Sequence, residues 1–133
     1  MIGLVIATHA RLGEELLKAS EMIIGPTENA CSVSINIGDS VESIREAISS
    51  AINAVGKEGD GVVIMTDMFG GTPSNISLSF LETERIEVLT GVNLPMVLKF
   101  FNSQEGLGLS ELSSILKAYG EQSISMPSEL LKK

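Results

Sequence analysis

The sequence predicts a doubly wound α/β domain, in which helices cover both faces of a parallel sheet. Short apolar runs alternate along the chain with segments whose apolar residues recur at helical spacing, and the strand–helix order repeats four times. Most of the apolar runs are continuous, as expected for strands buried on both faces of a sheet. Two of them end in a hydroxyl followed by an ionisable side chain. We therefore expect four parallel strands, with the chemistry at their carboxyl ends.

The first strand is predicted over residues 2–9, an apolar run that stops at Thr8 and His9, the only histidine of the chain. Helical spacing of the apolar residues that follow predicts a helix, which Gly25 and Pro26 end. The second strand is predicted over residues 31–37, where apolar side chains alternate.

A capping box from Asp39 to Glu42 predicts the start of the second helix, whose apolar spacing continues to Val55. A polar turn separates this helix from the third strand, predicted over residues 62–65. That strand ends in Thr66 and Asp67, so it repeats the ending of the first strand.

Thr72 is predicted to cap the third helix, with Pro73 as its first residue and Phe80 near its end. The fourth strand is predicted over residues 85–90, and the turn at residues 91–95 leads into another helix.

The last helix is predicted to begin at a capping Ser110 and to end at Gly120. Residues 121–126 then form a last, weak strand in this interpretation.

Length and composition exclude several classes of protein. A chain of 133 residues fits one domain over residues 1–133, and its formal charge of −8 disfavours binding to nucleic acid. The single cysteine, Cys31, excludes an internal disulfide and fits a reducing compartment. No apolar run approaches the ~18 residues of a membrane span.

We expect a cytoplasmic protein that does not insert into a membrane. Because no His, Cys and carboxylate cluster has metal-ligand spacing, we expect neither a metal nor another cofactor.

The candidate catalytic residues are His9 and Asp67, which end the first and third strands. If these strands are neighbours, as in the flavodoxin-like strand order, the imidazole and the carboxylate meet above the sheet. A carboxylate bonded to one ring nitrogen fixes the tautomer and leaves the lone pair of the other nitrogen free. Such an imidazole can act as a nucleophile or as a general base.

The candidate phosphoryl-binding residues are Gly70, Gly71 and Thr72, in the turn that opens the third helix. The glycines allow close approach of the backbone, and the free N–H groups with the Thr72 hydroxyl can receive a dianionic phosphoryl group. Together with His9 and Asp67, this turn indicates phosphoryl transfer to histidine. Each residue also has a purely structural interpretation, as a surface histidine, a loop cap or a helix start, and spacing alone does not decide between the two.

Three stretches resemble the enzyme IIA components of mannose-type (mannose/fructose/sorbose) phosphoenolpyruvate-dependent sugar phosphotransferase systems. They are Ala7-Thr8-His9-Ala10, Asp67-Met68-Phe69-Gly70-Gly71-Thr72-Pro73-Ser74-Asn75 and Gly91-Val92-Asn93-Leu94-Pro95-Met96. The resemblance extends in order and spacing along nearly the whole chain. This chain departs from the family at Ala7 and Ala10, where members often have glycine, and at Phe69, where members often have tryptophan.

The resemblance implies that His9 accepts a phosphoryl group from the phosphocarrier protein HPr and passes it to a IIB component. It further implies that Asp67 bonds the imidazole and that Thr72 lies beside the phosphoryl group. Residues 121–126 would form a fifth, antiparallel edge strand, which is exchanged between the subunits of a homodimer.

Two other functions stay open at this stage. One is a regulatory module that uses the same phosphohistidine as a signal and takes no part in sugar transport. The other is a flavodoxin-like nucleotide-binding domain, in which the turn at residues 70–72 holds a nucleotide phosphate. The scarcity of aromatic residues, 4% of the chain, offers little for stacking a flavin ring and disfavours the second.

Overall fold

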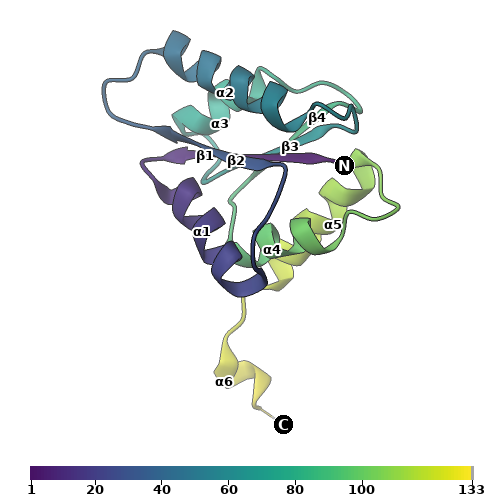
Figure 1. Cartoon of the computed structure of the whole chain (residues 1–133). Helices are drawn as coiled ribbons and strands as arrows, with labels where there is room; N and C mark the ends of the chain where they lie inside the picture. Colours follow the sequence, from purple (N-terminus) through teal and green to yellow (C-terminus); the bar gives the residue numbers. More distant parts are fainter. Residues whose placement is uncertain (133) are drawn as a thin grey trace.

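The computed structural model describes residues 1–132, which form one sheet with helices on both of its faces (Figure 1). The sheet has the strand order β2-β1-β3-β4 and all its pairings are parallel. The strands are β1 (Gly3–His9), β2 (Ala30–Ile35), β3 (Val62–Thr66) and β4 (Ile86–Thr90). The prediction of a doubly wound domain with four parallel strands is therefore confirmed.

Two helical layers cover this sheet (Figure 1). One face carries α1 (Leu12–Ile24), α4 (Leu94–Asn102) and α5 (Leu109–Gln122); the other carries α2 (Val41–Val55) and α3 (Thr72–Leu78). Side chains of β1 point alternately to the two layers. Leu4 and Ile6 pack in the core under α4 and α5, while Val5 and Ala7 pack under α2. Since all four are fully buried, β1 is the centre of both cores.

The strand order places the first crossovers on opposite sides of β1. The chain passes from β1 to β2 at one side and later returns to β3 at the other, which makes the carboxyl ends of β1 and β3 a topological switch point. In the register of these two strands, Ala7 lies opposite Thr66. The residues that follow, Thr8 and His9 on β1 and Asp67 after β3, are thereby brought to one edge of the sheet.

The second strand is shorter than predicted, and Ile37 lies outside it. The strand ends at Ile35 because the next residues form a turn: the Asn36 N–H donates to the Asp39 carboxylate at 2.8 Å, and Gly38 has a positive φ of 92°. Ile37 consequently is fully exposed rather than buried in the sheet.

The caps of two helices also differ from the prediction. At α2 the cap is Ser40, whose hydroxyl accepts from the Ser43 N–H at 3.0 Å, because the Asp39 carboxylate is used in the preceding turn. At α3 the N-cap is Gly71, so Thr72 is already the first residue of the helix. This helix ends at Leu78, two residues before Phe80.

The prediction for the last helix was wrong at both ends. Gly108, not Ser110, is the N-cap of α5, and the helix continues through Gly120 to Gln122. Gly120 instead lies against α4, where an added Cβ would be 2.6 Å from the terminal methyl carbon of Met96 and would require that side chain to move. Gly120 allows two helices to approach closely and does not end one.

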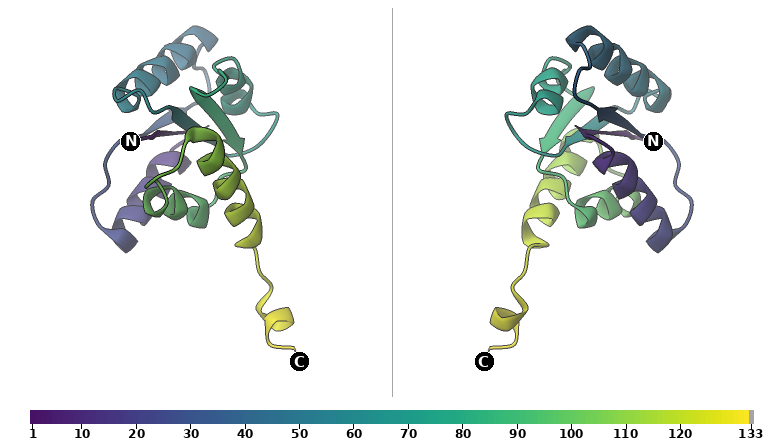
Figure 2. Two further views of the ribbon diagram at one scale, coloured as in Figure 1. Left: turned by 90° about the vertical axis from the view of Figure 1, so that its right-hand side faces the viewer. Right: turned by 90° about the vertical axis from the view of Figure 1, so that its left-hand side faces the viewer.

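Residues 121–126 do not form a strand within the described chain. The first two complete α5, the next four have no regular structure, and a short helix α6 (Pro127–Leu130) follows. Figures 1 and 2 show this segment standing clear of the domain. No helix of the described residues is both long and apolar enough to cross a membrane.

Candidate active site

The imidazole of His9 is held by the carboxylate of Asp67. The Oδ2 atom of Asp67 lies 2.8 Å from Nδ1 of His9 and also accepts the backbone N–H of His9 at 3.0 Å. Because a carboxylate only accepts, Nδ1 carries the proton and the lone pair lies on Nε2. The side chain of His9 is 49% exposed, whereas that of Asp67 is 13% exposed. Asp67 thus fixes the ring through Nδ1, and the half-exposed imidazole is free to react through Nε2.

Asp67 stays ionised under neutral conditions. Burial raises the pKa of its carboxyl group, but the hydrogen bonds from the side chain and backbone of His9, with the positive charge that the imidazole carries when protonated, outweigh burial and bring the pKa below its ordinary value. A negative charge therefore lies permanently beside Nδ1 of the imidazole.

Gly71 forms the wall on the other side of the imidazole. A Cβ at this residue would lie 2.9 Å from Cε1 of His9 and 3.5 Å from Nε2, so only glycine allows the present ring position. Gly70 has a positive φ of 87°, and its carbonyl accepts from the side chain of Asn75 at 3.3 Å. These two glycines bring the backbone of the turn against the ring.

A hollow of about 790 Å³ opens beside His9. Its lining comes from the end of β1, from the turn after β2 and from the start of α3, where Thr72 contributes. The structure thus brings His9, Asp67, Gly71 and Thr72 to one place. Gly70 shapes the turn, and a Cβ there would meet no other atom within 4 Å.

Large apolar side chains lie exposed on the loops around this hollow. Ile37 is fully exposed, Phe69 is 74% exposed and Met68 is 54% exposed. Arg11, the cation nearest to His9 in sequence, forms an ion pair with Glu14 at 2.9 Å. Exposed apolar side chains therefore lie on the loops that follow β2 and β3.

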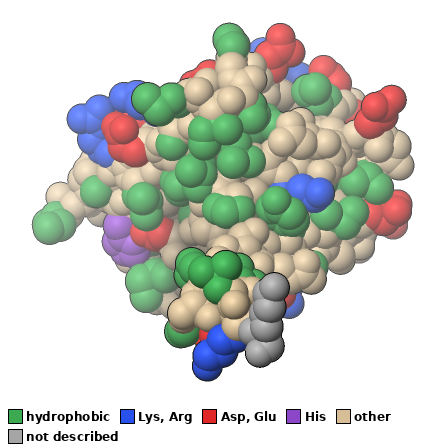
Figure 3. All heavy atoms as spheres, turned by 90° about the horizontal axis from the view of Figure 1, so that it is seen from below, with side chains coloured by type: hydrophobic (Ala, Val, Ile, Leu, Met, Phe, Trp, Pro, Cys, Tyr) green, Lys and Arg blue, Asp and Glu red, His purple; other side chains and the backbone are tan. Residues whose placement is uncertain are grey.

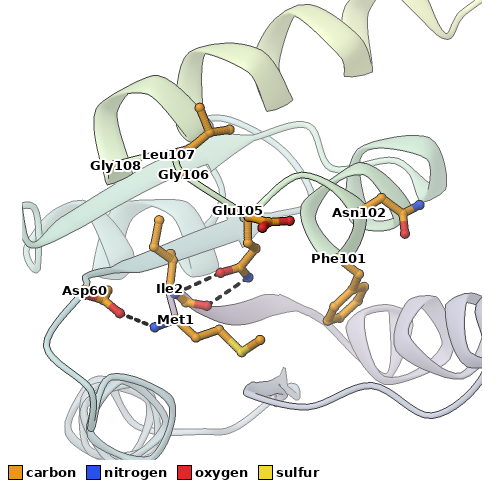
Figure 4. A pocket seen from close by; sticks show the side chains of 10 residues that line it. Met1, Ile2, Asp60, Phe101, Asn102, Glu105, Gly106, Leu107 and Gly108 are labelled. Atoms are coloured by element: carbon orange, nitrogen blue, oxygen red, sulfur yellow. Dashed lines mark hydrogen bonds and ion pairs between the residues drawn. The ribbon is translucent and has the colours of Figure 1, made fainter.

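A second hollow, of about 670 Å³, lies at the opposite, amino-terminal end of β1 (Figure 4). Several of its polar groups are paired with one another: the Gln104 side chain accepts the Ile2 N–H at 2.9 Å and donates to the Ile2 carbonyl at 3.0 Å. The N-terminal ammonium of Met1 pairs with Glu58 and Asp60. Since these groups are already paired, this hollow is a poor candidate for chemistry.

Two other kinds of reactive site, a cysteine nucleophile and a metal centre, find little support in the structure. Cys31 is half-buried, and burial raises the pKa of its thiol, which disfavours the reactive thiolate. Among residues 1–132, no three His, Cys, Asp or Glu side chains are placed to hold a metal ion.

Sequence reasoning missed the structural use of Thr8. Its side chain is fully buried, and its hydroxyl accepts the Gly13 N–H of α1 at 2.8 Å. The signal was present in the sequence: the residue before Leu12, where this helix starts, is Arg11, which is a poor N-cap, so the cap had to come from elsewhere.

Comparison with known proteins gives a consistent assignment. A family model described as the PTS system fructose IIA component matches residues 3–116. The fructose-specific EIIA component of Bacillus subtilis is 34% identical over 134 aligned positions, which cover 100% of this chain and 91% of that protein. The mannose-specific EIIAB component of Escherichia coli is 33% identical over 99 positions, covering 74% of this chain and 30% of that longer protein.

The fold also matches a solved structure. The crystal structure of a phosphotransferase system component EIIA from Streptococcus agalactiae superposes with a TM-score of 0.87 at 24% identity, covering 97% of this chain and 99% of that one. At that identity the likeness supports the fold alone.

Proposed function

The chain belongs to the mannose-type IIA family of phosphotransferase-system components, and on that premise we propose that His9 is its phosphoryl acceptor. The observation that carries this proposal is the contact between Nδ1 of His9 and Asp67, which leaves Nε2 as the free nucleophile. We assign the whole of residues 1–133 to one IIA domain that works in the cytoplasm.

In the proposed reaction, the lone pair of Nε2 attacks the phosphorus of a phosphohistidine donor. The new bond joins Nε2 to phosphorus, while the phosphorus–nitrogen bond of the donor breaks and its electron pair returns to the donor's imidazole. Because Nδ1 of His9 keeps its proton, the phosphorylated ring becomes a cation, which the carboxylate of Asp67 stabilises at 2.8 Å. Transfer to the next acceptor reverses these steps.

The turn at Gly70, Gly71 and Thr72 is our proposed phosphoryl-binding segment. Gly71 lies against the imidazole and Thr72 lines the hollow beside it, so the incoming phosphoryl group approaches the backbone and the Thr72 hydroxyl. Donors at this position stabilise the charge of the transferred group.

The proposed partners are HPr as donor and a IIB component as acceptor, in a relay that serves sugar transport. Both would approach the same half-exposed imidazole in turn, and the exposed side chains of Ile37, Met68 and Phe69 offer apolar contact around it. Such contacts suit brief docking of a protein better than binding of a polar sugar.

We further propose a homodimer in which the two chains exchange their carboxyl-terminal segments. β4 is an edge strand, and its five residues are only half-buried. Ile124 and Met126, in the segment that stands clear of the domain, are 79% and 59% exposed. Apolar side chains also gather on the face that carries α1, α4 and α5 (Figure 3). Pairing of residues 123–126 with β4 of a second copy would cover the edge of β4 and the side chains of Ile124 and Met126.

The deciding experiment is phosphorylation in a mixture of phosphoenolpyruvate, enzyme I and HPr, with His9→Ala as the variant. We expect an acid-labile, base-stable adduct on the wild-type chain and none on His9→Ala. Equal labelling of the variant would overturn the assignment. Capture of partners then separates transport from regulation, because a IIB component favours the relay and its absence favours a signalling module. Light scattering of the full chain tests the dimer.

A further inference from the structure

We propose that Thr8 is a positioning residue for His9, acting through the backbone that joins β1 to α1. This inference rests on the proposed role of His9 as phosphoryl acceptor. The Thr8 side chain is fully buried, so it meets neither the donor nor the phosphoryl group. Its hydroxyl accepts the Gly13 N–H at 2.8 Å and donates to the Ala10 carbonyl at 3.5 Å. One hydroxyl therefore spans the turn that holds the imidazole.

The start of α1 depends on this hydroxyl. Arg11 occupies the N-cap position, but its side chain makes no capping bond and pairs with Glu14 instead. Gly13 is buried against β1, where an added Cβ would lie 2.9 Å from the Ile6 carbonyl. Water does not replace the Thr8 hydroxyl there without displacing the helix, because the N–H of Gly13 faces the strand. Thr8 thus joins the helix start to the strand end.

Ala10, in the turn between the end of β1 and the start of α1, is in a strained conformation. Its φ is +50°, in the left-handed region that side chains with a Cβ rarely adopt. Such a conformation persists only where neighbouring bonds enforce it. Here the Ala10 N–H donates to the Ile35 carbonyl at 2.8 Å, and its carbonyl accepts from Thr8.

Loss of the hydroxyl would free the Gly13 N–H and the Ala10 carbonyl, so that the backbone of Ala10 could rotate toward an ordinary conformation and displace His9, which precedes it. The imidazole has little room for such a rotation, because Asp67 lies 2.8 Å from Nδ1 and Gly71 is packed against Cε1. A small displacement would therefore break the contact that sets the tautomer of His9. The effect reaches the ring through the backbone and needs no contact with the donor.

The test compares Thr8→Val, which has the same shape without the hydroxyl, with Thr8→Ser, which keeps the hydroxyl. The matched control is Ser20→Ala, since the buried Ser20 hydroxyl donates within α1 to the Leu16 carbonyl at 2.9 Å, away from His9. Three quantities are measured: the melting temperature, the phosphorylation rate at saturating phospho-HPr, and the ¹⁵N chemical shifts of the imidazole. The chain has one histidine, so those shifts report on His9 alone.

We expect Thr8→Val to lower the saturated rate roughly tenfold or more and to mix the two tautomers. Thr8→Ser is expected to restore both quantities, and Ser20→Ala to change only the melting temperature. A Thr8→Val protein that melts earlier but keeps the wild-type rate and tautomer would overturn the inference. If the wild-type chain accepts no phosphoryl group, the proposed function fails, while the imidazole shifts still decide the role of Thr8.

Discussion

The two ends of the sheet carry hollows of similar size whose polar groups are arranged in opposite ways. At the amino end, about 670 Å³ in volume, the side-chain amide of Gln104 and the backbone of Ile2 exchange two hydrogen bonds. At the carboxyl end, about 790 Å³, His9 is bound through one ring nitrogen and presents the other. Mutual pairing stabilises a fold, whereas a group fixed on one side and open on the other can react. The predictions below test this difference, beginning with the largest expected effect.

Asp67→Asn should slow phosphorylation of His9 by roughly 10–100-fold, because the amide accepts a hydrogen bond but supplies no charge to the cationic phosphoimidazole. The rate is measured with phospho-HPr as donor, and circular dichroism checks that the variant is folded. A folded variant that reacts at the wild-type rate would exclude an electrostatic role for Asp67.

Gln104→Ala should lower the free energy of unfolding by about 2 kcal/mol, since it removes two part-buried hydrogen bonds to Ile2. Phosphorylation is expected to be unchanged. Urea denaturation measures the loss, with Gln122→Ala, an exposed glutamine at the end of α5, as the control. A large effect of Gln104→Ala on the rate would mean that the two ends of the sheet are coupled.

Gly71→Ala should reduce the phosphorylation rate roughly tenfold, because its Cβ would lie 2.9 Å from Cε1 of His9 and displace the ring. The matched variant is Gly70→Ala, whose Cβ meets no atom but whose φ is +87°. That variant should lose about 1 kcal/mol of stability while changing the rate less. Equal rates for the two variants would argue against close packing of Gly71 on the imidazole.

Stability should also depend on pH through Asp67. Its pKa in the folded protein is below the ordinary value of 3.8, so its contribution is complete above that value and is lost as the pH falls through the folded pKa. Urea denaturation between pH 6 and pH 3 should therefore show a steeper loss below pH 4 for the wild type than for Asp67→Asn. Parallel curves would contradict the lowered pKa.

The sequence was sufficient to place His9 and Asp67 together, because parallel strands end at one edge and both residues follow such strands. It was insufficient wherever a contact distant in the sequence decided the outcome. Gly120 suggested a helix stop, but α5 continues past it and the glycine lies against Met96 of another helix. Ile37 is a different case, because a local turn, in which the Asn36 N–H donates to Asp39, ends the strand while the alternating pattern continues.

The strand predicted over residues 121–126 is not seen in the described chain. Residues 123–126 have no regular structure and extend away from the domain (Figure 2), although β4 is an edge strand of the same chain. The local pattern of residues therefore does not decide whether this segment pairs with a strand.

Ala10→Gly should give the smallest effect, a gain of about 0.5 kcal/mol in the free energy of unfolding. Relief of the left-handed conformation of Ala10, with φ of +50°, is worth about 1 kcal/mol, and the greater freedom of glycine in the unfolded chain offsets part of it. The comparison is Asn29→Gly at the amino end of β2, where φ is +59° in a residue type that tolerates it, so we expect no gain. Urea denaturation of both variants measures the difference. If Ala10→Gly gains stability and loses rate while Asn29→Gly does neither, the strain at the carboxyl end serves to hold His9; destabilisation by Ala10→Gly would show that Ala10 is not strained.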